Sequence, residues 1–124
     1  MNSFVILAKL PSLNDYILAC RANRYKGAQF KHDVEELIGW NIRQALAKKT
    51  LQPTSDPLTV NFVWHEKTKR RDADNIASAK KYILDAMQRQ GVIPNDNRKY
   101  IRGFTDIIID DTDDYVEVEL VPIE

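Results

Sequence analysis

Two stretches of the chain carry apolar residues at the spacing of an amphipathic helix. Between positions 29 and 49 they recur every three or four residues, which is the period of one helix face: Phe30, Val34, Leu37, Ile38, Ile42, Ala45 and Leu46. Trp40 falls outside this stripe, and Lys48 and Lys49 suit the negative end of a helix dipole. A second helix is predicted over 73–90, with Gly91 as its C-terminal stop and these residues on its apolar side: Ile76, Ala79, Ile83, Ala86 and Met87.

Runs of β-branched and aromatic residues predict strands elsewhere. They cover residues 4–9, 58–64, 99–104, 106–110 and 115–121, and the last of these alternates cleanly between apolar and polar side chains. A short helix is plausible over 15–22, after Pro11 and a cap at Ser12 or Asn14, and the polar residues 21–27 suit a loop. The order is strand, helices, strand, helix, strands. It predicts one α+β domain over residues 1–124, with a small mixed sheet packed against helices.

Composition narrows the class of protein. The chain is 44% hydrophobic, as expected of a globular protein, and has neither an apolar run of membrane-spanning length nor a signal-peptide layout at its start. Cys20 is the single cysteine, so an internal disulfide is excluded and a cytoplasmic location is expected. His32 and His65 are the only histidines, so a metal cluster built from Cys and His is not supported.

The net charge of zero hides an uneven distribution. All 18 Lys and Arg residues precede position 106, whereas eight of the 18 Asp and Glu residues lie from Asp106 onward. The first 105 residues therefore carry a formal charge of +8. This asymmetry indicates a surface that faces a polyanion, with an acidic back.

The stretch most informative about chemistry joins the two signs directly. Four cations in five residues run into two carboxylates and an amide, in the order Lys67-Thr68-Lys69-Arg70-Arg71-Asp72-Ala73-Asp74-Asn75. A phosphodiester nuclease needs both parts, because cations hold the DNA backbone and carboxylates hold a divalent metal ion against it. A simpler alternative is that Asp72 or Asp74 caps a helix that starts near Asn75.

Further candidates follow along the second predicted helix. Counted at 100° per residue from Asp74, Lys81 and Asp85 return to the same helix face, where they could equally form an ordinary i, i+4 ion pair. Asp96 lies in the turn after this helix, where an aspartate is also favoured for turn formation alone. A 16-residue helix is about 24 Å long, so Asp96 can reach Asp74 only if the chain folds back or a second subunit supplies it.

Four segments together resemble one family of enzymes. They occur in the family's order and cover most of the chain: Pro11-Ser12-Leu13-Asn14, Arg71-Asp72-Ala73-Asp74-Asn75, Lys81-Tyr82-Ile83-Leu84-Asp85-Ala86-Met87 and Gly91-Val92-Ile93-Pro94-Asn95-Asp96. This combination resembles the RusA family of Holliday-junction resolvases, which are bacterial and phage-borne endonucleases. In one departure, three more residues separate Asn75 from the lysine than in the family pattern.

The resemblance implies a RusA-like fold and a homodimeric, Mg²⁺-dependent endonuclease that nicks four-way DNA junctions symmetrically, in DNA recombination and repair. Its catalytic carboxylates and metal ligands would be Asp72, Asp74 and Asp96, and its helical lysine would be Lys80 or Lys81. We expect Lys81 to stabilise developing charge. The DNA backbone would be followed by five cations, namely Lys67, Lys69, Arg70, Arg71 and Lys80.

Two alternatives remain open at this point. A non-catalytic DNA-junction-binding module would use the same cations, with its carboxylates serving as caps and turns, although three acids beside a phosphate repel DNA unless a metal is present. A metal-dependent nuclease with another branched-DNA specificity is the second alternative. The PD-(D/E)-x-K class is disfavoured, because no Asp or Glu has a Lys two residues later.

Overall fold

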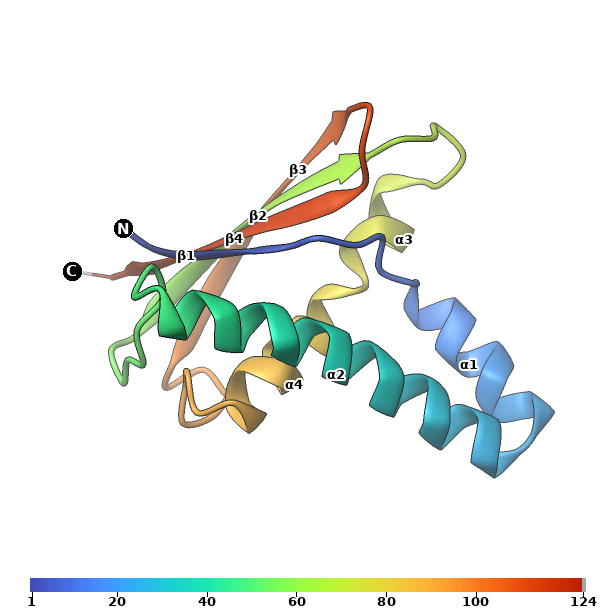
Figure 1. Cartoon of the computed structure of the whole chain (residues 1–124), viewed down its shortest axis with the longest axis horizontal. Coiled ribbons are helices and arrows are strands. Elements are labelled where there is room, and N and C mark those ends of the chain that lie inside the picture. The colour runs from blue at the N-terminus through green and yellow to red at the C-terminus, as the bar shows by residue number, and fades with distance from the viewer. Residues whose placement is uncertain (124) are drawn as a thin grey trace.

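The fold consists of a four-stranded sheet with its helices on one side (Figure 1). The structure is a computed structural model, and it describes residues 1–123. The strands are β1 (Asn2–Ile6), β2 (Leu58–Glu66), β3 (Ile101–Asp110) and β4 (Tyr115–Pro122). The helices are α1 (Leu13–Ala22), α2 (Arg24–Ala47), α3 (Ala73–Ala77) and α4 (Lys80–Arg89).

The sheet is mixed, with the strand order β1-β4-β2-β3. Strand β2 runs parallel to β3 and antiparallel to β4, and β1 is antiparallel to β4. The parallel pair requires a crossover, which α3 and α4 provide. These pairings confirm the predicted α+β class with a small mixed sheet.

One face of the sheet and one stripe of each long helix form the core. Alternate side chains of β2 and β4 are buried, as the period of two requires. They pack against the apolar stripes of α2 and α4, in a cluster that includes Phe62, Trp64, Ile38, Ile83 and Met87. None of the helices within residues 1–123 is long and apolar enough to cross a membrane.

Several predicted boundaries were wrong. The first strand ends at Ile6 rather than at residue 9, since the Leu7 amide turns to Asn41 Oδ1 at 3.3 Å. Residues 21–27, expected as loop, are helical except for Asn23, which ends α1 and caps α2 by accepting a hydrogen bond from the Lys26 amide at 2.8 Å. The two strand-like runs at 99–104 and 106–110 form the single strand β3.

The predicted helix over 73–90 is divided in two at Ser78 and Ala79. The Ser78 hydroxyl donates to Asn75 O at 2.6 Å and accepts from the Leu13 amide at 3.1 Å. The next backbone bonds, Ala79 N to Ile76 O and Tyr82 N to Ala79 O, span three residues rather than four. A serine hydroxyl that competes for backbone groups weakens helix continuity. Asp74 and Lys81 therefore lie on different helices, and counting along one helix does not relate them.

Candidate nucleic-acid and metal site

The segment after β2 is anchored by a buried ion pair. Glu66, the last residue of β2, is 5% exposed, and its carboxylate accepts hydrogen bonds from Arg71 Nη2 at 3.0 and 2.9 Å and from Nε at 3.1 Å. Arg71 Nη1 also donates to Leu10 O at 2.9 Å. The predicted DNA contact Arg71 thus has its guanidinium committed inside the protein. Its structural role is to close the loop formed by residues 67–70.

That loop exposes the remaining cations of the basic run. Lys67, Lys69 and Arg70 are all exposed. The Lys69 ammonium lies 3.8 Å from Asp110, but both side chains are largely in solvent, so this pair adds little stability. Cations held this way remain available to a phosphate backbone.

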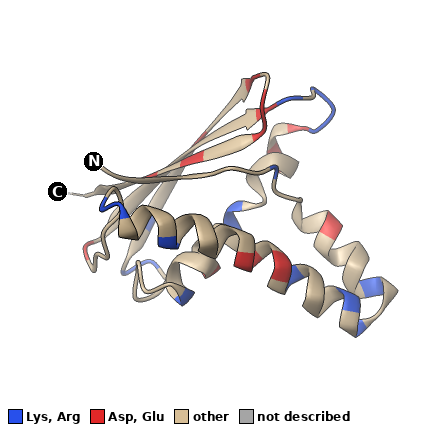
Figure 2. Cartoon of the chain, viewed as in Figure 1, with Lys and Arg blue, Asp and Glu red and all other residues tan. Residues whose placement is uncertain are grey.

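The acidic C-terminal part of the chain does not form a surface separate from the basic loop. Asp114 at the β3–β4 turn accepts a hydrogen bond from the Lys67 amide at 2.8 Å, and Asp111 N donates to Glu66 O at 2.9 Å. Figure 2 shows the blue loop after β2 beside the red turn between β3 and β4. The expected division into a basic face and an acidic back is therefore wrong at this point, because the sheet brings residues 110–114 against the basic loop.

Asp72 and Asp74 stand at the start of α3, directly after the Arg71 anchor. Asp72 occupies the N-cap position, yet its side chain makes no capping hydrogen bond. Asp74 lies in the first turn, and its Oδ1 accepts only from the neighbouring Asn75 amide at 3.0 Å. Both residues are exposed. Capping therefore does not account for the Asp72 carboxylate, which is free to bind a ligand.

The Pro11–Asn14 segment packs beside the N-terminal end of α3. Asn14 Nδ2 donates to Asn75 Oδ1 at 3.3 Å, and the Tyr82 hydroxyl donates to Ser12 O at 3.0 Å. Burial raises the pKa of Tyr82 to about 12, so its hydroxyl stays protonated and able to donate even in alkaline solution. Segments that are far apart in the sequence thus converge on the α3–α4 junction.

Asp96 reaches the first turn of α4 within the same chain. Gly91, with φ of +77°, ends α4, and the Val92 amide bonds back to Met87 O at 2.8 Å, which reverses the chain. Asp96 Oδ2 then accepts a hydrogen bond from Lys81 Nζ at 3.0 Å. The chain folds back as one of the two expected routes requires, although it brings Asp96 to Lys81 and not into contact with Asp72 or Asp74.

Lys81 also pairs with Asp85 at 3.0 Å, so the expected i, i+4 ion pair is present. Hydrogen bonds to Asp85 and then Asp96 raise the pKa of Lys81 against the opposing effect of burial. Within residues 1–123, no three Asp, Glu, His or Cys side chains come together in a way that could hold a metal ion. The three predicted ligands are thus divided between the start of α3, with Asp72 and Asp74, and the start of α4, with Asp96.

The two adjacent lysines of α4 have different surroundings. Lys80 Nζ donates to Asp106 Oδ2 at 2.6 Å and lies 4.6 Å from the centre of the Phe104 ring. Its side chain is 22% exposed, compared with 54% for Lys81. Lys80 therefore fastens α4 to β3, and Lys81 is the helical lysine that faces solvent beside a carboxylate.

A histidine cluster at the end of β2 was not anticipated from the sequence. His65 is 7% exposed, with Nδ1 at 2.8 Å from Asp111 Oδ2 and Nε2 at 2.7 Å from Glu117 Oε2, and its ring stacks on Tyr115 at 3.8 Å. Burial lowers the pKa of His65, but the two carboxylates outweigh it and the net pKa is raised. An imidazole that donates from both nitrogens carries a positive charge. The only sequence signal was a histidine at the end of a strand otherwise apolar on alternate positions.

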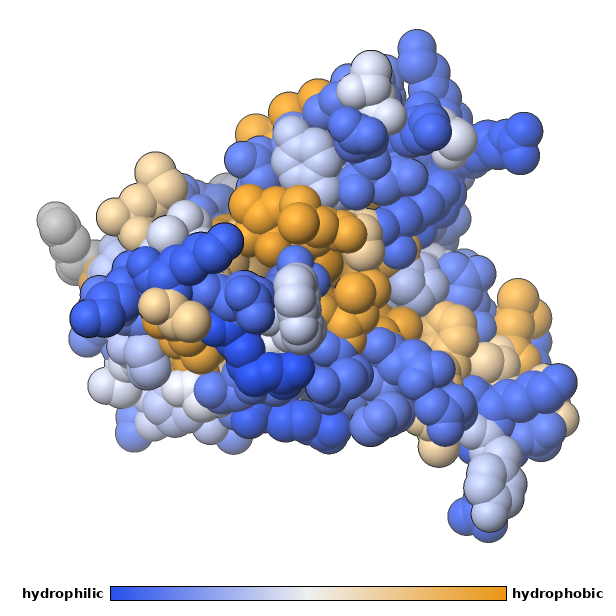
Figure 3. Space-filling view, viewed as in Figure 1, coloured by the Kyte–Doolittle hydropathy of each residue, from blue (hydrophilic) through white to orange (hydrophobic). Residues whose placement is uncertain are grey.

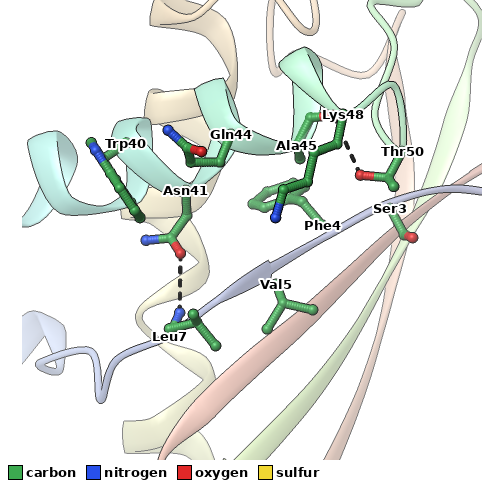
Figure 4. A pocket seen from close by; sticks show the side chains of 10 residues that line it. All are labelled: Ser3, Phe4, Val5, Leu7, Trp40, Asn41, Gln44, Ala45, Lys48 and Thr50. Atoms are coloured by element: carbon green, nitrogen blue, oxygen red, sulfur yellow. Dashed lines mark hydrogen bonds between the residues drawn. The ribbon is translucent and has the colours of Figure 1, made fainter.

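A separate hollow lies between β1 and α2. It has a volume of about 390 Å³ and is lined by ten residues without an acid or a histidine. Leu7 and Trp40, at 73% and 53% exposed, belong to its rim. Figure 3 shows an orange apolar patch in the middle of this view. Figure 4 shows Trp40 from α2 and Lys48, which follows α2, on one side of the hollow, with Val5 from β1 and Leu7, which follows β1, on the other. Its lining offers no group for phosphodiester hydrolysis.

Comparison with known proteins adds no assignment. The chain matches no protein-family model, and no curated protein matches it significantly.

Proposed function

We propose that this protein is a Mg²⁺-dependent, structure-selective endodeoxyribonuclease that resolves Holliday junctions by paired symmetric nicks. The observation that carries the proposal is the sequence of groups along residues 66–74. A buried Glu66–Arg71 pair holds a loop of exposed cations, and two exposed carboxylates follow immediately at Asp72 and Asp74. DNA backbone binding and metal-assisted hydrolysis need these two kinds of group in close proximity.

The donors present suit magnesium. Mg²⁺ is a hard cation that keeps several waters and takes one or two carboxylates, so Asp72 and Asp74 would form its protein ligands. Asp96 lies apart from them, beside Lys81 at the start of α4, and would join the set only if the cation drew the two segments together. The Asp96 carboxylate already accepts a cationic group, the Lys81 ammonium, at 3.0 Å. When bound, the metal would polarise the scissile phosphate and supply an activated water.

The remaining roles belong to the chain's own cations. Lys67, Lys69 and Arg70 would bind successive phosphates from the loop after β2. Lys81 would stabilise the negative charge that develops on the phosphate, because it is the exposed lysine of α4. Arg71 and Lys80 would not contact DNA. They would stabilise the site through their ion pairs, Arg71 with Glu66 and Lys80 with Asp106.

The substrate favours a homodimer. A four-way junction has near two-fold symmetry and must be cut twice, and a closed two-fold dimer presents two equivalent sites to it. A DNA substrate and the lone Cys20 both suit the cytoplasm as the place of action. Such an activity belongs to DNA recombination and repair, in a host or a prophage.

The test is cleavage of a synthetic four-way junction. We expect paired nicks with Mg²⁺ and none with EDTA, and we expect Asp74→Asn to bind the junction without cutting it. Binding without cutting by the unmodified protein would favour a junction-binding module. Cutting of forks or flaps in preference to four-way junctions would indicate another branched-DNA specificity.

A further inference from the structure

The elbow between α1 and α2, residues 21–26, carries a second group of exposed cations. Arg21 lies in the last turn of α1, and Arg24 and Lys26 lie in the first turn of α2. All three are exposed, and none of them forms an ion pair within residues 1–123, whereas both lysines of α4 pair with carboxylates. Tyr25, which stands between two of these cations in the sequence, is 87% exposed. Exposed cations next to an aromatic ring are typical of surfaces that bind nucleic acid.

The cations of the elbow are unfavourable for the helix that carries them. A helix dipole is positive at its N-terminus, so acids stabilise the first turn and cations destabilise it. The first turn of α2 nevertheless contains no acid, and no Asp or Glu occurs anywhere between Asp15 and Asp33 in the sequence. Local conflicts of this kind are expected where residues serve binding rather than folding. An anionic ligand would relieve the conflict.

The elbow has a closely packed backbone. Asn23 ends α1 and caps α2, since its Oδ1 accepts a hydrogen bond from the Lys26 amide at 2.8 Å. Gly27 is buried, and a Cβ at this position would lie 2.6 Å from Cys20 Sγ, so the two helices meet too closely for a side chain there. A ligand that binds a pre-organised support of this kind does not have to order its backbone.

Helix α1 connects the elbow to the start of α3. The Leu13 amide donates to Ser78 Oγ at 3.1 Å, and Asn14 Nδ2 donates to Asn75 Oδ1 at 3.3 Å, so α1 begins beside α3. The ten residues of α1 span about 15 Å. In Figure 2 the blue elbow and the blue loop after β2 lie toward the same end of the molecule, with α3 and the start of α1 between them. A separation of this order is close to the width of the DNA major groove, about 12 Å.

We infer that the α1–α2 elbow is a second contact to the DNA backbone, and that it holds the same duplex arm as the loop after β2, on the other side of a groove. This inference rests on the DNA-binding part of the proposed function. It requires no metal ion, because the elbow cations bind phosphates directly. The start of α3 would then face DNA that is held from both sides.

Removing two elbow cations tests this contact. For Arg24→Gln combined with Lys26→Gln, we expect the affinity for a labelled four-way junction in EDTA to fall about tenfold or more at near-physiological salt. Fluorescence anisotropy over several salt concentrations should show the slope of log affinity against log salt become less negative by about two units. The control is Lys48→Gln combined with Lys49→Gln, which removes two exposed cations at the other end of α2, about 36 Å away, and should change neither quantity.

Two further measurements exclude a merely structural role for the elbow. The melting temperature of the Arg24→Gln, Lys26→Gln variant should not fall, because the charges that it removes oppose the helix dipole. The exchange of Arg24→Lys with Lys26→Arg keeps both charges and should keep the salt slope of the unmodified protein. A slope lowered equally by the exchange and by the removal would overturn the inference.

The outcomes also separate this inference from the proposed function. An elbow variant that binds the junction with the affinity and slope of its control would overturn the inference, and cutting by the unmodified protein would leave the proposed nuclease standing. Elbow-dependent binding by a protein that does not cut with Mg²⁺ would support the inference and overturn the nuclease. A folded, unmodified protein that does not bind the junction would overturn both.

Discussion

The guanidinium of Arg71 spans both carboxylate oxygens of Glu66, with Nη2 at 3.0 Å from Oε1 and 2.9 Å from Oε2. Bidentate pairs of this kind are geometrically specific as well as strong. With 19% and 6% of their side chains exposed, the two residues are largely removed from water. The pair fixes the base of the loop from which the basic residues project.

Arg71→Ala should destabilise the fold by about 3 kcal/mol, because it leaves the Glu66 carboxylate buried without its partner. The free energy of unfolding in urea measures this loss. Arg70→Ala is the matched control, since Arg70 is exposed and should change stability by less than about 0.5 kcal/mol. Equal effects of the two variants would contradict the division of roles between these neighbours.

Arg70→Ala should instead weaken DNA binding across sequences. Affinity falls with salt, and each phosphate contact that is lost makes the slope of log affinity against log salt less negative by about one unit. The slope can be measured by fluorescence anisotropy on a labelled junction at several salt concentrations. Lys48→Ala, at the far end of α2, removes the same charge elsewhere and should leave the slope unchanged. An unchanged slope for Arg70→Ala would mean that the loop does not face DNA.

Asp72→Asn and Asp74→Asn should each reduce junction cleavage by about a thousandfold or more, because a metal ion supplies several kcal/mol of transition-state stabilisation. DNA binding should be retained or tightened, since a negative charge is removed. The Asp72 side chain makes no capping hydrogen bond, and the side-chain oxygen of an asparagine at position 74 could still accept the bond from the Asn75 amide. The melting temperature should therefore hardly change in either variant. Asp33→Asn on α2 controls for loss of an acid, and full cleavage by Asp72→Asn or Asp74→Asn would refute the assignment.

The His65 cluster should make stability depend on pH. The folded-state pKa of His65 is raised, so its contribution is fully present below the unfolded-state pKa of about 6.5 and is lost as pH rises through the folded-state value. The melting temperature should therefore fall as pH rises across that range. His65→Gln should remove this component of the pH dependence, and a profile identical to that of the unmodified protein would exclude a charged His65.

Asp111 should contribute at the acidic end of the same profile. The Thr112 amide and then His65 lower the pKa of Asp111 by hydrogen bonding, so this contribution is present above the ordinary carboxyl pKa and is lost as pH falls through the lowered value. Asp111→Asn should reduce the fall in melting temperature as the pH is lowered into the acidic range. The Asp113→Asn variant, changed at an exposed neighbour, serves as its control.

Light scattering should give about twice the 14.3 kDa chain mass at micromolar concentration. The central strand β2 is paired on both sides, and its apolar side chains lie in the core, so it is not available to a partner. Edge strand β3 does expose apolar residues, among them Ile107 at 57%. A monomer that still makes paired cuts would contradict the dimer.

Hydrophobic periodicity was sufficient to predict the fold class but not the ends of its elements. The stripe of α2 and the alternation of β2 and β4 follow directly from burial on one face. The break between α3 and α4 does not, because Ser78 acts through a hydrogen bond with Leu13, which is 65 residues away in the sequence. Contacts of that range leave no trace in local spacing.

The candidate site was predictable in its residue types and less so in their roles. The run from Lys67 to Asp74 indicated cations next to acids, yet nothing local distinguished Arg71, which is committed to Glu66, from the exposed Arg70. Lys80 and Lys81 were likewise equivalent until β3 provided Asp106 as a partner for Lys80. Tertiary partners decide which member of a charged run remains available, and a sequence pattern does not contain them.

The sheet order has a consequence for how the chain is made. Strand β4 is the last of the four to leave the ribosome, yet it lies between β1 and β2 and pairs with both. Until residues 115–122 emerge, the N-terminal strand lacks its sheet partner and one edge of β2 is unprotected. Exposed strand edges attract other chains. Newly made chains should therefore be most prone to aggregation until β4 has emerged and paired, and any delay between the emergence of β3 and that of β4 should prolong this exposure.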